Sequence, residues 1–539
     1  MKYNKLKIIA RRVLYVGIFI LTTTILAYHN DTANLFFQNK INTRLKNQLK
    51  LDIYSSTNKI ANFFDIKGKI LSIVSPVNDS NIVDLFVDEN KFKLLTQKKK
   101  KWIDADLLID GIKQDIKLKL HGTSSAHYID GKFSFRVKLK NNSDTLNRME
   151  VFNLIKAEEA DPTIIAANKL ASNFGLISSH GKMIILTINN KNWGAYYLVE
   201  RISTNLLERE FSITKHAKIS HVSDWTRKEN NFGSNHISDF DLYPGHVKHN
   251  SSPFHATALG KYKRMCLCVE QNKIEELTHF FDANYMGKYL SILALFNDIH
   301  HVSGDNFKLI YDFKTKKFYP IYRQESGSRK LYQRVISQED IFYNNFVNFN
   351  KFIFNKSLPT YTYGKNTAIL KALLSNDSIR NIRDKQLLKI VKNQNEYVNN
   401  MKDVYIENLS VLYSSGLSRR SQYFKEKQQC EVFSSMCSYA KNYLDYAHVY
   451  GSFNLTDSTL NVITDAFSQV EISLCKNKPN NYLVNGITFN NDLEMKYNYQ
   501  EISLKGKNCK VNDIIFKNNI TKDTIRKVYI NELIEDDSY

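Results

Sequence analysis

Short stretches in which apolar and polar residues alternate run through residues 79–140, and this alternation is typical of half-buried β-strands. The stretches read NIVDLFVD, KWIDADLLIDG, IKQDIKLKLHG and KFSFRVKLK. An Asp-Gly pair at 110–111 is a favoured two-residue hairpin turn. We therefore predict an antiparallel sheet in this part of the chain.

The pattern then changes from strand-like to helical and back. Residues 161–176 (DPTIIAANKLASNFGL) carry Asp at the cap, Pro in the first turn and Gly near the end, as helices do. Residues 182–202 place two apolar strands around the turn NNKN, which predicts a hairpin, and STNLLEREF continues from it into a helix.

The second half of the chain is mostly helical before it becomes strand-like again. Residues 274–299 are a strongly helical run, residues 307–322 predict a strand pair joined by FKTK, and residues 331–425 predict further helices, whereas 212–265 show no clear period. From 445 onward, short alternating segments with Asn-rich turns predict a separate small β domain (445–539).

These elements make the protein an α+β chain, and its 539 residues are enough for two or three domains with cores of their own.

The N-terminus has the pattern of a membrane-targeting segment. A basic tail (1–12) precedes an uncharged apolar run (13–28), and no Lys or Arg follows until Lys40. A cleaved signal peptide is the alternative, but no small-x-small cleavage site follows the run. We predict a single-pass signal anchor with the N-terminus in the cytoplasm, a helical stalk (29–74) and the bulk of the chain outside the cytoplasm.

The formal net charge is +21. Either Lys and Asn are simply abundant throughout the chain, or the protein meets an anionic polymer or lipid surface. No RNA-binding signature interleaves the charges, so we expect no nucleic-acid partner.

An exported chain with six cysteines permits disulfides. Cys430 with Cys437, and Cys475 with Cys509, are candidate pairs by region. The motif Cys266-Leu-Cys268 is too tight for a zinc knuckle, and we predict no metal there.

Polar groups collect where the helical run 274–299 meets the strand pair 307–322. Residues 300–312 read HHVSGDNFKLIYD, and Asp298 stands just before them. The residue types by themselves leave two interpretations of this stretch open, a polar turn or an active site.

Three stretches together resemble the spore-coat CotH kinase family, an atypical branch of the protein-kinase-like fold. They are LKLHGTSSAHYIDGKFSFRVKLK (118–140), MIILTINNKNWGAYYLVERIS (183–203) and NDIHHVSGDNFKLIYDFKTKKFYPIY (297–322). The resemblance implies a two-lobed core with a β-rich N-lobe and a helical C-lobe, which we extend over residues 75–430. It also implies ATP and Mg²⁺ as cofactors.

The resemblance assigns roles at the polar junction. Asp298 would orient the acceptor hydroxyl, His300 would brace the loop, and Asn306 would ligate Mg²⁺. The family carries an aspartate after the second strand pair, where this chain has Gln324 followed by Glu325. Either Glu325 replaces that aspartate by a one-residue shift, or metal binding is impaired.

Further residues would meet the nucleotide in the N-terminal half. Gly122 and Ser124 would bend over phosphates, Lys132 and Arg136 would bind them, and Glu200 would pair with a lysine or lie near the adenine. We predict Lys132, Arg136 and Lys138 on one strand, where a period of two puts all three on the same face. The alternatives are a tight turn, a row of these three basic residues that faces water, and an exposed strand-end carboxylate. His121 stands where the family has Arg, and Phe133 where it has a second Lys.

The predicted function is an exported kinase that transfers the γ-phosphoryl group of ATP to Ser or Thr of a coat or envelope protein. Two alternatives remain: a catalytically decayed kinase-fold scaffold, which Gln324 suggests, and an enzyme that acts on an envelope polymer.

Overall fold

The structure is a computed structural model. It describes residue 15 and residues 81–97, 101–122, 132–140, 149–156, 162–220, 253–296, 307–323, 364–414, 426–474, 480–486, 488–489, 495–505 and 513–533. Apart from Tyr15, the predicted basic tail, membrane anchor and stalk lie outside this part of the chain. No helix in the described residues combines the length and the apolar character needed to span a bilayer. The predicted mixture of helices and sheets is confirmed.

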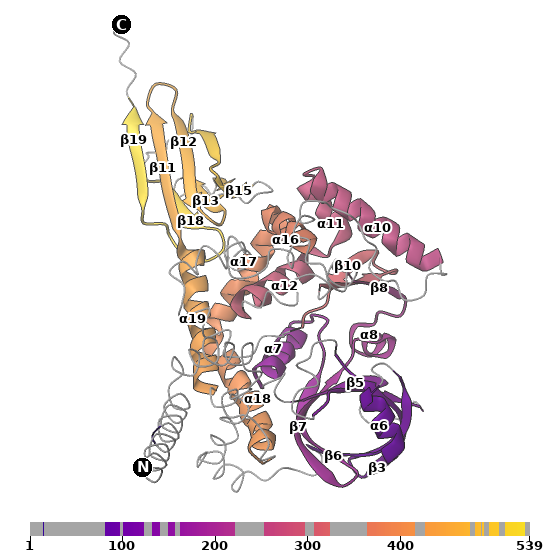
Figure 1. Ribbon diagram of the computed structural model, residues 1–539. Coiled ribbons are helices and arrows are strands. Elements are labelled where there is room, and N and C mark those ends of the chain that lie inside the picture. The colour runs from indigo at the N-terminus through magenta and orange to yellow at the C-terminus, as the bar shows by residue number, and fades with distance from the viewer. Residues whose placement is uncertain are drawn as a thin grey trace, which may run out of the picture. The chain divides into compact units, whose positions relative to one another are not determined.

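The chain divides into two compact units. In the first unit, seven strands among the described residues form a closed barrel in the order β1-β2-β3-β4-β5-β7-β6 (Figure 1). Neighbouring strands are antiparallel except for the parallel pair β1–β6. The strands are β1 (Ile82–Phe86), β2 (Ile103–Ile109), β3 (Ile112–Leu120), β4 (Phe135–Leu139), β5 (Val151–Lys156), β6 (Gly181–Ile188) and β7 (Lys191–Glu200).

The alternating sequence explains the barrel, because every second side chain points into one core. That core contains Leu118, Val137, Leu154 and Leu198 from four different strands, all buried. Both predicted hairpins are confirmed, and their turns have positive φ at both central residues, at 110–111 and at 189–190. This backbone matches the twist of the strands that it joins.

Helix α6 (Glu89–Gln97) lies across the ring of strands in Figure 1 and was not predicted. Its Phe92 ring packs against Phe135 and Trp193, with centroids 6.3 Å and 5.7 Å away. The Asp88 carboxylate caps it by accepting from the N–H groups of Asn90 and Lys91. The helix is short, so its helical period was hidden between two strand patterns.

The other helices in the described residues are α7 (Pro162–Asn173), α8 (Thr204–Phe211), α10 (Pro253–Glu270), the 3₁₀ turn η6 (Ile274–Glu276), α11 (Leu277–Phe280), α12 (Ala283–Phe296), α16 (Gly364–Ser375), α17 (Asp377–Lys392), α18 (Gln394–Ser414) and α19 (Glu426–Asp445). Predicted helices at 161–176 and after 203 correspond to α7 and α8. The described part of 331–425 is helical, as predicted.

The described part of the helical run predicted over 274–299 is helical, but it is divided into η6, α11 and α12, because the chain breaks before α12. Phe281 is extended, and Asp282 starts the new helix by accepting the Tyr285 N–H at 2.7 Å. In the second unit, β8 (His216–Ser220), β9 (Lys308–Asp312) and β10 (Lys317–Pro320) form a sheet of order β10-β9-β8. The β9–β10 pair confirms the predicted strand pair at 307–322.

Helices α12, α17 and α19 pack around a buried polar network. The Arg383 guanidinium is fully buried and lies 2.7 Å from the Asp384 carboxylate, and it also donates to the Tyr443 hydroxyl. Tyr443 donates in turn to Asp384 at 3.1 Å. The network ties α17 to α19 and satisfies the polar groups that the helices bury.

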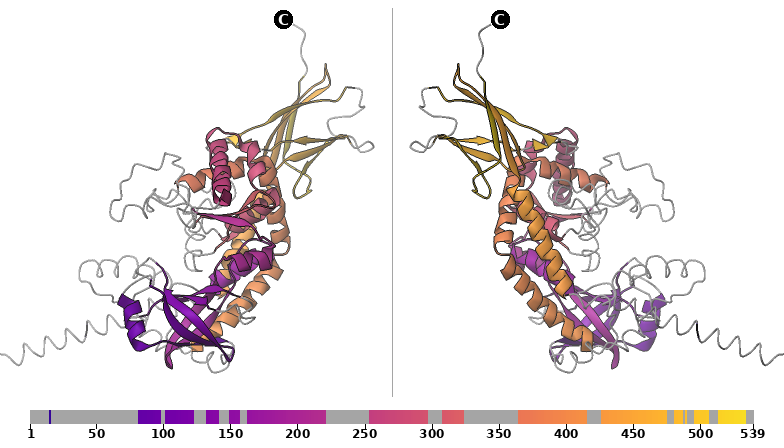
Figure 2. Two further views of the ribbon diagram at one scale, coloured as in Figure 1. Left: turned by 90° about the vertical axis from the view of Figure 1, so that its right-hand side faces the viewer. Right: turned by 90° about the vertical axis from the view of Figure 1, so that its left-hand side faces the viewer.

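Past α19 the described residues are strands of two sheets, β17-β12-β11-β19 and β14-β13-β18, with a small pair β15-β16. Figure 2 shows α19 continuing directly into this part. The strands are β11 (Ala447–Asn454), β12 (Thr459–Ala466), β13 (Val470–Leu474), β14 (Asn480–Val484), β15 (Thr488–Phe489), β16 (Met495–Lys496), β17 (Tyr499–Ser503), β18 (Ile515–Asn518) and β19 (Val528–Leu533). The inner faces of the two larger sheets share one apolar core.

The predicted Cys430–Cys437 disulfide is wrong. Both thiols are free and buried in α19, as Cys266 and Cys268 are in α10. A separation of seven places both α19 thiols on one apolar face of the helix, where they pack as small hydrophobic groups. Cys475 and Cys509 lie outside the described residues.

Candidate functional site

Several residues to which the sequence assigned roles lie outside the described residues: Asp298, His300, Asn306, Gln324, Glu325 and Ser124. The residues that flank the first five belong to the part of the chain that the structure describes. They show which elements carry the two ends of each segment.

The β8–β9–β10 sheet gathers three segments at one end. Lys308 starts β9, accepts the Ile321 N–H at 2.9 Å, and is paired with Ser220 at the end of β8. The segments that follow Ser220, precede Lys308 and follow Ile321 are therefore attached at the same end of the sheet. Two of them contain the predicted catalytic loop and the predicted metal ligands.

Tyr285 of α12 holds this end of the sheet to the helices. Its buried hydroxyl accepts the Ile177 N–H at 2.8 Å and donates to the Pro320 carbonyl at 2.7 Å. The Tyr322 N–H donates to the Ile177 carbonyl at 2.8 Å. Helix α12 itself ends at Phe296, two residues before Asp298. The helix that leads into the predicted catalytic loop thus also fixes the strand that follows it.

In the barrel, the predicted phosphate-binding residues lie around the start of β4. The His121 N–H donates to the Ser134 carbonyl at 2.8 Å, and Gly122 next to it has a φ of 91°, a conformation that favours glycine. Lys132 precedes β4, so the prediction that it shares one strand face with Arg136 and Lys138 is wrong. The strand begins only at Phe135.

Arg136 lies on the outer face of the barrel, partly buried. It donates from Nε to the Asn153 side chain at 3.2 Å and from Nη2 to His121 Nδ1 at 3.1 Å. Because a guanidinium only donates, Nδ1 of His121 must accept. Burial and the neighbouring charge of Arg201 lower the pKa of Arg136 to about 10.

Arg201 directly follows β7 and was not singled out in the sequence. Burial lowers its pKa too, and among the described residues neither guanidinium forms an ion pair. Two partly buried cations that repel each other gain from a shared anion. The pair therefore fits an anionic group such as a phosphate. The signal that could have revealed this pair of arginines is the strand register. Arg136 is opposite Asn153 on β5, and the Arg201 N–H donates to the Val151 carbonyl of the same strand.

Glu200 directly precedes Arg201 but faces the opposite side of the barrel wall. It is 2% exposed, so the alternative of an exposed strand-end carboxylate is wrong. It is paired with Phe152, on the face of β7 that Tyr196 and Leu198 turn into the barrel core. Arg136 and Arg201 lie on the outer face of the same barrel wall, so Glu200 does not share their surface.

The described residues contain no cluster of three or more His, Cys, Asp or Glu side chains that could bind a metal ion. The residues predicted for Mg²⁺ fall outside this part of the chain. What the described residues offer is a cationic surface for phosphate groups, together with the framework on either side of the predicted loops.

The segments described above also lie within a match to a known protein family. None of the curated proteins matches this sequence. The family model described as CotH kinase protein matches residues 118–446, from β3 to the end of α19. The match covers more than half of the chain and includes Arg136 on β4, Arg201 directly after β7, the β9–β10 hairpin and α12. The chain therefore belongs to the CotH kinase family.

Proposed function

We propose that this protein is an ATP-dependent protein kinase, exported and held at a membrane, that phosphorylates Ser or Thr of a coat or envelope protein. Family membership supports a kinase in general. The observation that carries the proposal is the attachment of the predicted catalytic and metal segments at one end of the β8–β9–β10 sheet. A kinase needs both segments at one site.

In the proposed reaction, the bond between the γ-phosphorus and the ADP oxygen breaks, and a bond to the acceptor hydroxyl oxygen forms. Asp298 orients that hydroxyl and accepts its proton. Bound Mg²⁺ would supply positive charge to the phosphate oxygens, with Asn306 and Glu325 as its proposed ligands. Arg136 and Arg201 would bind a phosphate group through charged N–H donors.

A matched pair of variants tests the phosphate contact. Arg136 and Lys138 share one face of β4, but Lys138 is exposed and lies 3.5 Å from the Glu150 carboxylate. We expect Arg136→Ala to weaken ATP binding about tenfold or more, and Lys138→Ala to change it less than about threefold. Calorimetry with the purified full chain, with and without Mg²⁺, measures both. Equal effects of the two changes would contradict this role for Arg136.

Transfer is tested separately, with radiolabelled ATP and a Ser/Thr-rich acceptor protein. Asp298→Asn should reduce transfer at least a hundredfold while ATP still binds. Transfer at the wild-type rate in this variant would reject the proposed catalytic residue. Glu325→Gln should remove the Mg²⁺ dependence of ATP binding if this carboxylate has replaced the aspartate of the family.

The second candidate is a kinase-fold scaffold without catalysis, and the amide of Gln324 in place of a carboxylate favours it. An amide adds no negative charge to a metal site, so the affinity for Mg²⁺ would fall. Absence of ATP binding under all conditions, in a folded wild-type chain, would support the scaffold and reject the kinase.

A further inference from the structure

The outer face of the β17-β12-β11-β19 sheet carries an unusual row of side chains. Strand register places Tyr499, Ile463, Tyr450 and Tyr529 directly opposite one another, one from each strand. They are 60%, 39%, 43% and 55% exposed, respectively. At about 4.8 Å between strands, the row is roughly 14 Å long.

These side chains add little to the folded core. The alternate residues of the same strands, such as Val449 and Val462, face the opposite way into the shared core. The exposed rings are nevertheless ordered by their neighbours. Tyr450 and Tyr529 stack with centroids 5.3 Å apart, and the Tyr499 hydroxyl donates to the Asn461 side chain. A contiguous exposed aromatic patch of this kind marks a binding surface.

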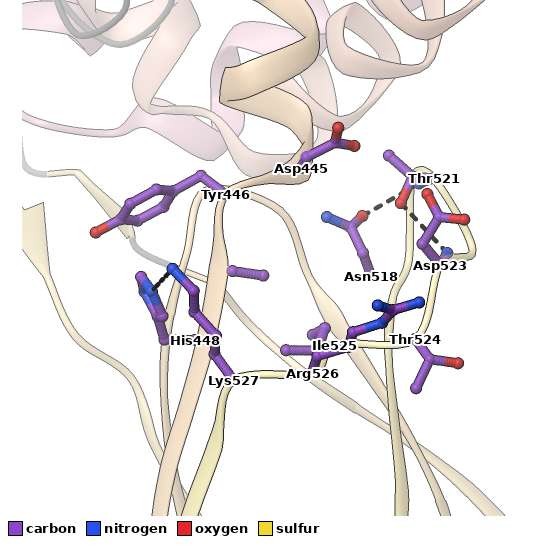
Figure 3. Close-up of a pocket in the computed structure, with 11 residues that line it drawn as sticks. Asp445, Tyr446, His448, Asn518, Thr521, Asp523, Thr524, Ile525, Arg526 and Lys527 are labelled. Atoms are coloured by element: carbon purple, nitrogen blue, oxygen red, sulfur yellow. Dashed lines mark hydrogen bonds between the residues drawn. The ribbon is translucent and has the colours of Figure 1, made fainter.

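A cavity of about 280 Å³ lies beside the row, at the end of the sheet next to α19 (Figure 3). Of its lining residues, His448 lies on β11, and Tyr446 and Lys527 directly precede β11 and β19, so the cavity adjoins the end of the sheet that carries the row. Lys527 Nζ lies 3.2 Å from His448 Nε2, and His448 Nδ1 lies 3.4 Å from the Asp465 carboxylate. Since Lys only donates, Nε2 accepts and the ring proton is on Nδ1, facing Asp465.

The charge of this surface differs from that of the chain. The charged side chains on the outer face of these strands and in the cavity lining are Asp445, Asp465, Glu501, Asp523, Arg526 and Lys527, four acidic and two basic, in a chain with a net charge of +21. The neighbouring row across the strands is Glu501, Asn461, Ser452 and Asn531. This surface would attract an anionic partner only weakly. An uncharged partner rich in hydroxyl groups matches both the aromatic row and the neighbouring polar row.

From this combination we propose that the outer face of the β17-β12-β11-β19 sheet, with the adjoining cavity, binds a neutral polysaccharide. The apolar C–H face of a sugar ring packs on a tyrosine ring, and the sugar hydroxyls bond to the amide and hydroxyl side chains of the neighbouring row. The cavity is at the small end of ligand sites and accepts a single sugar ring better than a folded protein segment. The binding does not depend on kinase activity.

The test uses the purified full chain with insoluble cellulose and insoluble chitin as probes, and immobilised polyglutamate as an anionic comparison. Depletion of the protein from solution measures binding. We expect retention on at least one neutral polysaccharide that persists in 0.5 M salt and is reversed by the matching soluble oligosaccharide. The double variant Tyr450→Ala/Tyr529→Ala should bind about tenfold more weakly or worse.

Two further variants separate loss of contact from loss of fold. Tyr450→Phe/Tyr529→Phe keeps both rings and should bind within about threefold of wild type. Leu483→Ala changes an apolar residue, 51% exposed, on β14 of the other sheet, and should have no effect. Circular dichroism and the thermal midpoint confirm that each variant is folded.

Several outcomes would overturn the proposal. These are no retention of wild type on either neutral polysaccharide, equal retention of the double alanine variant, and binding to polyglutamate alone that salt abolishes. Self-association of wild type that the double alanine variant loses, without polysaccharide binding, would assign the face to a second copy of the chain instead.

Discussion

Replacement of Gly287 by Ala tests how closely the helix that leads into the predicted catalytic loop must pack. Gly287 is buried in α12, and a Cβ added there would lie 2.5 Å from Ile382 Cγ2 and 2.9 Å from the backbone nitrogen of Arg383. The first contact could be relieved by side-chain movement, but the second is with the backbone of α17. The two helices would therefore have to separate.

The magnitude follows from two opposing terms. Ala is favoured over Gly inside a helix by about 1 kcal/mol. Overpacking costs about 1–3 kcal/mol, and a backbone contact at this distance lies at the upper end of that range. We therefore expect Gly287→Ala to destabilise the α12–α17 packing by about 2 kcal/mol.

Gly260 supplies the matched control, because it lies in α10 and an added Cβ there would have no neighbour within 4 Å. Gly260→Ala should stabilise its helix by about 0.5–1 kcal/mol. Hydrogen exchange of peptides from α12, α17 and α10 in the full chain measures each local free energy of opening. Equal protection of α12 in the Gly287→Ala variant and wild type would refute the close-packing argument.

Three other changes probe buried polar groups. Asp384→Ala should cost about 3–5 kcal/mol because it leaves the Arg383 charge buried without its carboxylate, whereas Asp377→Ala, at a partly exposed ion pair, should cost less than about 1 kcal/mol; urea unfolding compares them. Tyr285→Phe should cost about 1–3 kcal/mol in the same assay, since two buried backbone groups lose their partner. Asn518→Ala should increase hydrogen exchange at the end of α19, because the Asn518 side chain donates to the Leu444 carbonyl at 2.7 Å.

Much of the local structure could be predicted from the sequence, because it depends on neighbouring residues. Alternation located the barrel strands, and the two-residue turns at 110–111 and 189–190 follow from residues that tolerate positive φ. The break before α12 could not be read in the same way. The apolar period continues through it, and only the Asp282 side chain, which caps α12, shows that the helix starts anew.

The sequence predicted the order of the site motifs along the chain, but it could not predict how the site residues group in space. Arg136 and Arg201 come close only because β4, β5 and β7 are neighbours in a closed barrel with a particular register. Glu200 directly precedes Arg201 in the sequence, yet alternation turns it into the core. The same reason hid the row from Tyr450 to Tyr529, whose members are spread over 80 residues and meet only through strand pairing.

A single residue, Tyr446, separates the end of α19 from the start of β11. Its ring packs at 5.1 Å from Phe467, and the Asn518 bond to Leu444 secures the same corner. Such a connection has almost no slack, unlike a flexible tether, whose reach grows with its length. A ligand on the sheet would consequently stand at a set distance from α19 and its neighbouring helices. For a tethered reaction, that distance would decide which acceptor groups are accessible and which are not.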